Sequence, residues 1–191
     1  HKGIELLGDH LDEMTQRTKS IGNVVSTIYN VQAAFFRPEQ KKFWITSGTA
    51  PANLTEYIEL PFGWDHSHVD FTHSIPPNSF STTPKYEAMK AYTKAYDYFS
   101  NFKDFARALE EVEKAIQWDE KEFAYPLAKG YLLLKLRKFN LALDAFKTTE
   151  KVAYTDHEKA LTHLFQARSY DLLKERHKSK EIYARYLRDS K

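Results

Sequence analysis

The order of apolar and polar positions divides the chain into two parts that follow different periodicities. Near the start, apolar residues recur at intervals of three and four positions, at Ile4, Leu7, Leu11 and Met14. This spacing is typical of an amphipathic helix, because residues three and four apart share one helical face. It predicts a helix over residues 3–16 whose acidic residues face water, namely Asp9, Asp12 and Glu13.

Two segments with the composition of β-strands follow this helix. Residues 24–36 are rich in β-branched and aromatic side chains, and so are residues 41–47. The turn between them, Arg37–Gln40, contains a proline, so the three segments together predict a β-hairpin. A lone hairpin with so apolar an edge is marginally stable and prone to pair. We therefore expect it to belong to a larger sheet, much of which lies outside this chain.

The second part of the chain, from residue 85 onward, has helical periodicity and an internal repeat. The pattern of aromatic, aliphatic and small residues from Tyr96 to Ala115 returns from Gly130 to Thr149, at an offset of 34 residues. A third copy begins at Ala167, at an offset of 37, and becomes polar toward its end. Terminal repeats commonly degenerate in this way because they face solvent. The pattern predicts six helices in three antiparallel pairs.

This 34-residue pattern resembles the tetratricopeptide repeat, a pair of antiparallel helices that small residues allow to approach closely. In the second copy Gly130 and Ala142 occupy such small positions, and Ala108 does so in the first. The sequence departs from the family pattern at Tyr96, where a small residue is expected, and at Arg176, where an aromatic residue is expected. The resemblance implies an all-α array whose inner groove is lined by the first helix of each pair.

The repeat register also predicts which side chains line this groove. The groove residues that we predict are Lys90, Asp97, Asn101, Leu127, Tyr131, Leu134, Lys135 and Arg168. They form a mixed surface without the cluster of Lys, Arg and Asn that would bind the terminal carboxylates of a chaperone. We expect an apolar contact around Tyr131 and Leu134, flanked by charges, made with a catalytic domain upstream in the same protein or with a separate peptide or protein partner.

Prolines and charge mark the boundary between the two parts. Six of the seven prolines lie between Pro38 and Pro84, and residues 75–84 combine proline with Ser, Thr and Asn, which is typical of a linker. Residues 1–84 carry 6 basic and 9 acidic side chains, whereas residues 85–191 carry 22 and 17. We predict an α+β chain with one domain over residues 1–74, a linker over 75–84 and a helical-repeat domain over 85–191.

Composition narrows the function classes. The 191 residues carry 28 basic and 26 acidic side chains, so no strong overall field favours nucleic acid or an anionic membrane. The absence of cysteine excludes disulfides, thiolate metal sites and a cysteine nucleophile on this chain. No stretch has the layout of a signal peptide or a transmembrane helix, which slightly favours the cytoplasm, although a chain beginning with His1 leaves the compartment open.

The first part resembles the closing segment of a known enzyme group. The resemblance covers roughly residues 3–62 and is carried by three features of this sequence: an acidic helix with Asp9-His10 upstream of the hairpin, the turn Pro38-Glu39-Gln40, and an aromatic strand with the exit Ser47-Gly48-x-x-Pro51. These features are similar to the acyl-coenzyme A:6-aminopenicillanate acyltransferase and choloylglycine hydrolase group of N-terminal-nucleophile hydrolases. The resemblance implies that the helix and hairpin are a piece of an αββα sandwich.

What this resemblance implies for chemistry depends on a residue that the chain lacks. In the family, an N-terminal cysteine freed by autocleavage attacks an amide or thioester carbonyl. This nucleophile would lie upstream of His1, so the present chain would be a non-catalytic C-terminal portion of an acyltransferase or amidohydrolase, joined to a helical-repeat domain. The alternative function is a repeat scaffold for protein–protein interaction with no enzymatic role.

Other candidate sites have weaker support. A histidine-rich segment supplies four weak metal candidates, His66, His68, Asp70 and His73, but a solvated or packing loop is the default interpretation. Ser26 or Ser47 with His10 and Asp9 could be written as a triad, yet no Gly-x-Ser-x-Gly motif is present. No glycine-rich phosphate loop occurs either.

The basic run after Leu173 is interrupted by acidic residues, so a solvated terminal helix is the preferred interpretation. We therefore expect no cofactor, no nucleic acid and no membrane.

Overall fold

The computed structural model describes residues 2–21, 24–26, 28, 30–61 and 73–189. The chain forms two compact units, His1–Tyr86 and Glu87–Lys191. The first unit combines a short helix with two antiparallel sheets, and the second is all-helical. The segment proposed as a linker, 75–84, contains the last residue of a strand and the 3-10 helix Ser79–Thr82.

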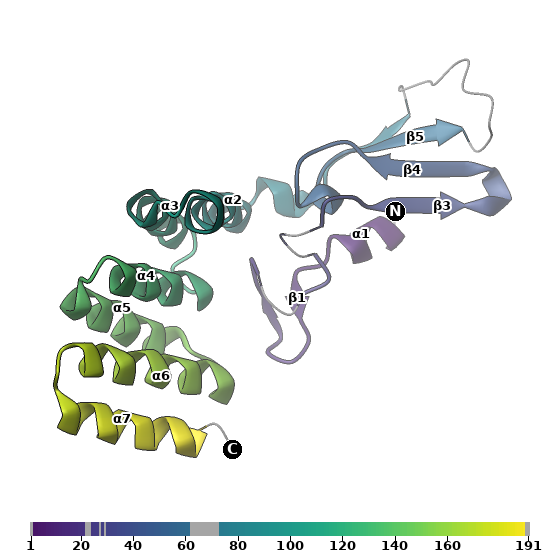
Figure 1. The fold of residues 1–191 in the computed structure, drawn as a ribbon. Helices are drawn as coiled ribbons and strands as arrows, with labels where there is room; N and C mark the ends of the chain where they lie inside the picture. The colour runs from purple at the N-terminus through teal and green to yellow at the C-terminus, as the bar shows by residue number, and fades with distance from the viewer. Residues whose placement is uncertain (1, 22–23, 27, 29, 62–72, 190–191) are drawn as a thin grey trace. The chain divides into compact units, whose positions relative to one another are not determined.

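The first unit contains these elements in chain order: α1 (Lys2–Leu7), β1 (Leu11–Asp12), β2 (Arg17–Thr18), β3 (Ala34–Arg37), β4 (Lys42–Thr46), β5 (Tyr57–Pro61) and β6 (Ser74–Ile75). Strands β1 and β2 form a small antiparallel pair. Strands β3 to β6 form a four-stranded antiparallel sheet in which each strand pairs with the next (Figure 1). The fold is therefore α+β, as the sequence predicts.

The predicted hairpin is present, in a shorter form. Strands β3 and β4 pair antiparallel around the 3-10 turn Pro38–Gln40, with Phe35 opposite Trp44 and Phe36 opposite Phe43. Among the described residues of the range 24–36, for which a strand was predicted, only those from Ala34 onward form one, as part of β3. The expectation that the hairpin belongs to a larger sheet is confirmed, because β5 and β6 extend it to four strands. That more of the sheet lies outside this chain stays a prediction.

The helix predicted over residues 3–16 ends at Leu7. The side chain of Asp9 accepts a hydrogen bond from the backbone N–H of Leu11 at 2.8 Å, and that of Asp12 accepts one from Met14 at 3.0 Å. These local bonds compete with the helical pattern and turn the chain into β1. The predicted exposure is wrong at Asp12, which is buried beside Lys19, and at Met14, which is 83% exposed. Glu13 is exposed, as predicted.

The two faces of the four-stranded sheet differ. On one face Trp44 and Tyr57 are buried against Ile4 of α1, with Phe35 and Ile75 packed around them. Strand register places a second set of side chains on the opposite face, namely Phe36, Phe43, Ile45, Ile58 and Leu60. This face is apolar as well, and its Phe36 is 53% exposed.

The second unit contains the six helices that the repeat predicts, with a π-helical segment at Tyr98–Phe102. They are α2 (Pro84–Asp97), α3 (Phe105–Trp118), α4 (Ala124–Lys135), α5 (Phe139–Val152), α6 (Asp156–Leu172) and α7 (Arg176–Asp189). From α3 onward each helix packs on the next, and Figure 1 shows α4 to α7 stacked in sequence order. Short connections make successive helices antiparallel.

The turn inside each helix pair contains a left-handed residue at the repeat offset. Lys103, Arg137 and Lys174 all have left-handed backbone conformations, with φ of 54°, 59° and 63°. They lie 34 and 37 residues apart, which are the offsets of the sequence pattern. In the second and third turns the following N–H groups, of Lys138 and Glu175, donate to carbonyl groups five residues back. This bond is typical of a Schellman helix end.

Helices α4 and α5 approach each other closely at Gly130. The Phe146 ring is fully buried and occupies the space where a side chain on Gly130 would begin, so a Cβ there would collide with it. Ala142, also fully buried, packs in the same cluster with Leu133 and Ala145. The small residues that the repeat pattern places at these helix interfaces therefore do what the sequence predicts.

We expect Gly130→Ala to destabilise the second unit. Alanine is the better helix former by about 1 kcal/mol, but the collision with Phe146 should cost about 1–3 kcal/mol of overpacking. Urea unfolding followed by circular dichroism measures the sum. In a Phe146→Leu background, where the ring is absent, the same substitution should cost less. If Gly130→Ala raised the stability of the otherwise wild-type protein, that result would contradict this close packing.

Candidate functional site

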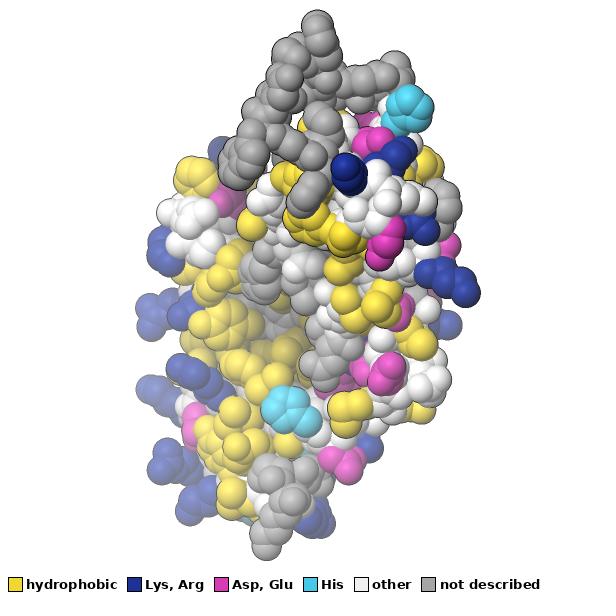
Figure 2. All heavy atoms as spheres, turned by 90° about the vertical axis from the view of Figure 1, so that its right-hand side faces the viewer, with side chains coloured by type: hydrophobic (Ala, Val, Ile, Leu, Met, Phe, Trp, Pro, Cys, Tyr) yellow, Lys and Arg dark blue, Asp and Glu magenta, His cyan; other side chains and the backbone are white. Residues whose placement is uncertain are grey.

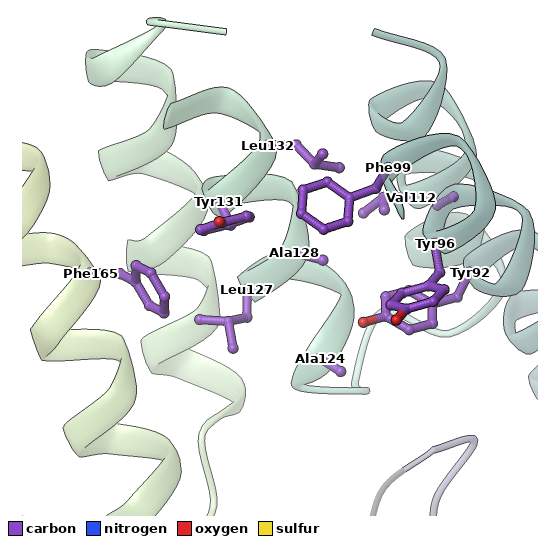
Figure 3. A pocket seen from close by; sticks show the side chains of 11 residues that line it. Tyr92, Tyr96, Phe99, Val112, Ala124, Leu127, Ala128, Tyr131, Leu132 and Phe165 are labelled. Carbon is purple, nitrogen blue, oxygen red and sulfur yellow. The ribbon is translucent and has the colours of Figure 1, made fainter. Parts of the chain in front are cut away.

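An apolar pocket of about 270 Å³ opens in the second unit (Figure 3). Its lining residues are Tyr92, Ala95, Tyr96, Phe99, Val112, Ala124, Leu127, Ala128, Tyr131, Leu132 and Phe165. None of them is charged, and nearly all come from α2 with its π-helical extension, α4 and α6, the first helices of the three pairs. The pocket therefore lies on the side of the array where the repeat predicts a groove.

A line of aromatic rings forms the wall of this pocket. Phe99 meets Tyr131 edge-on with ring centroids 5.8 Å apart, and Tyr131 meets Phe165 edge-on at 5.7 Å. Phe165 is in turn stacked on the buried ring of Phe146 at 5.6 Å. Ring pairs at these distances stabilise the fold by more than the burial of their apolar area alone would. The wall is thus anchored in the core of the array, which keeps the pocket open.

The π-helical segment decides where its aromatic side chains point. Phe99 faces the pocket, whereas Tyr98 and Phe102 line a second hollow together with charged residues such as Asp97 and Arg107. Phe102 is 66% exposed there. One extra residue in a helical turn rotates the side chains that follow it. This segment therefore gives the array two aromatic surfaces at one helix end.

Two lysines lie on the aromatic wall. The Lys103 Nζ is 5.8 Å from the centroid of the Phe99 ring, and the Lys135 Nζ is 5.2 Å from that of Tyr131. These distances fit cation–π contacts. Both ammonium groups remain exposed, so positive charge adjoins one end of an uncharged pocket.

The predicted groove residues divide into three groups. Leu127 and Tyr131 line the pocket, and Lys135 adjoins it. Leu134 packs against the buried cluster of α4 and α5 instead. The remaining four lie outside the lining: Lys90 binds Glu87, Asn101 donates to Asp97 at 2.6 Å, and Arg168 is exposed on α6.

Several lining residues were not predicted as groove residues. Tyr96 and Phe99 lie within the first copy of the repeat pattern, and the sequence predicts no groove role for Tyr92 or Phe165. Their shared aromatic character was the available signal, because large aromatic side chains are enriched at binding surfaces. The sequence contains no signal for the π-helical segment that directs Phe99 into the pocket.

The metal candidates are only partly covered by the structure. His66, His68 and Asp70 lie outside the described residues. His73 is exposed, and its carbonyl oxygen accepts a hydrogen bond from the N–H of Glu59 at 3.2 Å. Within the part of the chain that the structure describes, no three potential ligands of a metal ion come together.

His10 and Ser26 occupy buried positions in the first unit. The His10 ring stacks on Phe80 with centroids 3.5 Å apart, and its Nδ1 lies 2.9 Å from the carbonyl oxygen of Lys19. Burial lowers the pKa of His10 to about 4, with Lys85 adding to this effect and Asp9 opposing it. The Ser26 hydroxyl accepts a hydrogen bond from Asn53 at 2.8 Å. These contacts describe a packed core rather than a charge-relay site.

The His10 pKa predicts a pH dependence of stability. A histidine with a lowered pKa in the folded state binds its proton mainly when unfolded, so its contribution to stability is complete above its unfolded pKa of 6.5 and is lost as the pH falls toward 4. The loss should approach about 1.4 kcal/mol per pH unit. We expect the imidazole NMR signals of His10, assigned with a His10→Gln variant, to stay unchanged from roughly pH 7 to 5. A midpoint near 6.5 would show that the ring is open to water.

Comparison with known proteins does not assign the chain to a family. No protein-family model matches the chain, and no curated protein is significantly similar to it. Among the described helices, none combines the length and the apolar character that crossing a membrane requires.

Proposed function

We propose that the second unit is a tetratricopeptide-like protein-interaction module whose pocket binds an apolar side chain of a peptide or protein partner. The observation that carries this proposal is the uncharged, aromatic-walled pocket lined almost entirely by the first helices of the pairs. An apolar surface of this kind, bordered by charge, is typical of sites that accept a partner. Its volume of about 270 Å³ suits one large side chain rather than an extended ligand.

The repeated turns support the repeat character of this module. The three helix pairs each have a left-handed residue in their turn at the spacing of the sequence pattern, namely Lys103, Arg137 and Lys174. Arrays of such pairs form extended surfaces that bind partners through side chains of successive repeats. The pocket spans α2, α4 and α6 and thus draws on all three pairs.

A second candidate concerns the first unit. The resemblance to N-terminal-nucleophile hydrolases makes residues 1–74 the closing segment of an αββα sandwich. It is favoured by the apolar second face of the four-stranded sheet, which includes Phe36, Phe43 and Ile45, because a second sheet packs on such a face in a sandwich. The gene sequence upstream of His1 tests this candidate, which requires a cysteine able to become an N-terminus.

We expect the purified chain to hydrolyse neither amides nor thioesters, because it contains no cysteine. Turnover of a phenylacetyl amide and of a phenylacetyl thioester, measured at several protein concentrations, checks this. A rate that rises in proportion to the protein concentration, and that survives a second purification step, would contradict both the prediction and the proposed place of the nucleophile.

The pocket itself is tested by filling it. N-acetyl-phenylalanine amide, a neutral probe, should shift the methyl NMR signals of Ala95 and Ala124 in a saturable way. The variant Ala128→Phe places a ring inside the pocket. It should weaken binding of the probe by about tenfold or more, because the new ring occupies the space in which the probe makes its apolar contacts. Ala106→Phe, on the exposed side of α3, is the matched control and should bind as the wild type does.

Peptide selection then tests the interaction itself. Random peptides displayed on phage should yield binders that share a large apolar residue when selected on the wild-type chain and on Ala106→Phe. These peptides should no longer bind the Ala128→Phe variant. Binders that recognise all three proteins equally would place the interaction outside the pocket and contradict the proposed function.

A further inference from the structure

Basic side chains gather at one end of the helical array. The turns inside the three pairs all lie at the same end, because successive helices run antiparallel. Their exposed cations, together with the lysine in the last turn of α4, form a set that we name the basic end: Lys103, Lys135, Arg137, Lys138 and Lys174. Figure 2 shows exposed Lys and Arg side chains beside apolar ones on the face it presents.

The basic end has no carboxylate neutralising it within the described part of the chain. None of its five cations has an ion pair or a hydrogen bond with an acidic side chain there. The acidic residues of these turns are engaged elsewhere: Asp104 accepts from the N–H of Arg107, and Glu175 binds Lys178. The positive charge is therefore available to a partner.

Positive charge adjoins the pocket at one particular end. Lys103 lies on the Phe99 ring and Lys135 on the Tyr131 ring, and both rings line the pocket. A partner side chain seated among these rings has its neighbouring residues within reach of the two ammonium groups. Carboxylates at those neighbouring positions would meet exposed, unpaired cations, which favours their encounter and fixes their direction.

A nucleic acid fits this surface less well than an acidic peptide does. Single strands bind by stacking bases on exposed aromatic faces. Here Lys103 covers Phe99, Lys135 covers Tyr131, and the two rings also contact each other edge-on. The adjoining pocket is uncharged and closed on one side by buried residues, so it suits an apolar side chain and not a phosphate backbone.

We propose that the partner of the pocket is an acidic peptide segment, in which one aromatic or large aliphatic side chain enters the pocket and flanking carboxylates lie against Lys103, Lys135 and the basic end. This inference deepens the proposed function and rests on it. The apolar anchor supplies the contact area, and the carboxylates select among partners that carry such an anchor.

Three blocked heptapeptides of defined composition test the inference on the full chain. Each carries a central residue between two pairs of charged residues: phenylalanine between glutamates, phenylalanine between lysines, and alanine between glutamates. Methyl signals of Ala95, Ala124 and Ala128 report binding in the pocket. The first peptide should bind about tenfold more tightly than the other two, because each of them lacks one half of the recognition.

Charge reversal identifies the cations responsible. The double variant Lys103→Glu with Lys135→Glu should bind the acidic phenylalanine peptide about tenfold more weakly than the wild type does. It should bind the basic phenylalanine peptide more tightly. The matched control, Lys121→Glu with Lys151→Glu, makes the same charge change at the turns of the opposite end and should alter binding by less than about twofold. Circular dichroism and the binding of neutral N-acetyl-phenylalanine amide confirm that both double variants keep the fold and the pocket.

The outcomes separate this inference from the proposed function. Equal binding of the two phenylalanine peptides, or equal effects of the two double variants, overturns the acidic partner and leaves an apolar docking pocket intact. Binding of none of the phenylalanine probes overturns both. Tighter binding of a single-stranded thymidine oligonucleotide than of the acidic peptide, lost in Lys103→Glu with Lys135→Glu, assigns the basic end to nucleic acid and likewise overturns the inference.

Discussion

The contact between Phe146 and the backbone of α4 at Gly130 sets the geometry on which the helical array depends. Because Gly130 has no side chain, the buried Phe146 ring lies directly against the helix and stacks on Phe165 of α6. Phe165 then meets Tyr131, which meets Phe99. The pocket wall is therefore the outer end of the packed core. A site held in this way needs little rearrangement to bind, which reduces the free-energy cost of association.

The turns show a second constraint, and it concerns charge. A left-handed residue at a helix end is usually glycine, since other residues pay about 1–2 kcal/mol in that conformation. Here three turns carry Lys103, Arg137 and Lys174 at this position. A cation there faces the carbonyl end of the preceding helix, which offsets part of the strain. The same choice also leaves an exposed positive charge at one end of every pair, and in the first pair this charge, on Lys103, lies beside the pocket.

The sequence predicted most where structure is local. The second unit follows the repeat because each helix buries one face against its neighbour in the chain, so period and offset suffice. In the first unit the side chains of Asp9 and Asp12 accept hydrogen bonds from backbone N–H groups and end the helix. The spacing of the apolar residues gives no sign of these bonds. Strand β5 was missed because five residues ending in proline carry little signal. Of the pocket, Leu127 and Tyr131 were predicted, whereas Phe99 depends on the π-helical segment, which leaves no pattern in the sequence.

The pocket lies where the first repeat departs from the other two. The position that Gly130 occupies in the second copy is Tyr96 in the first, and Tyr96 is 45% exposed and lines the pocket. In the second and third turns the closing hydrogen bond spans five residues, whereas in the first it runs from the N–H of Asp104 to the carbonyl of Tyr98, six residues back. A large residue at the close-packed position and one extra residue in the turn both prevent α2 from meeting its neighbours as α4 does. The space left between the first and second copies is the pocket, so the irregularity of the first repeat is the structural origin of the binding site that we propose.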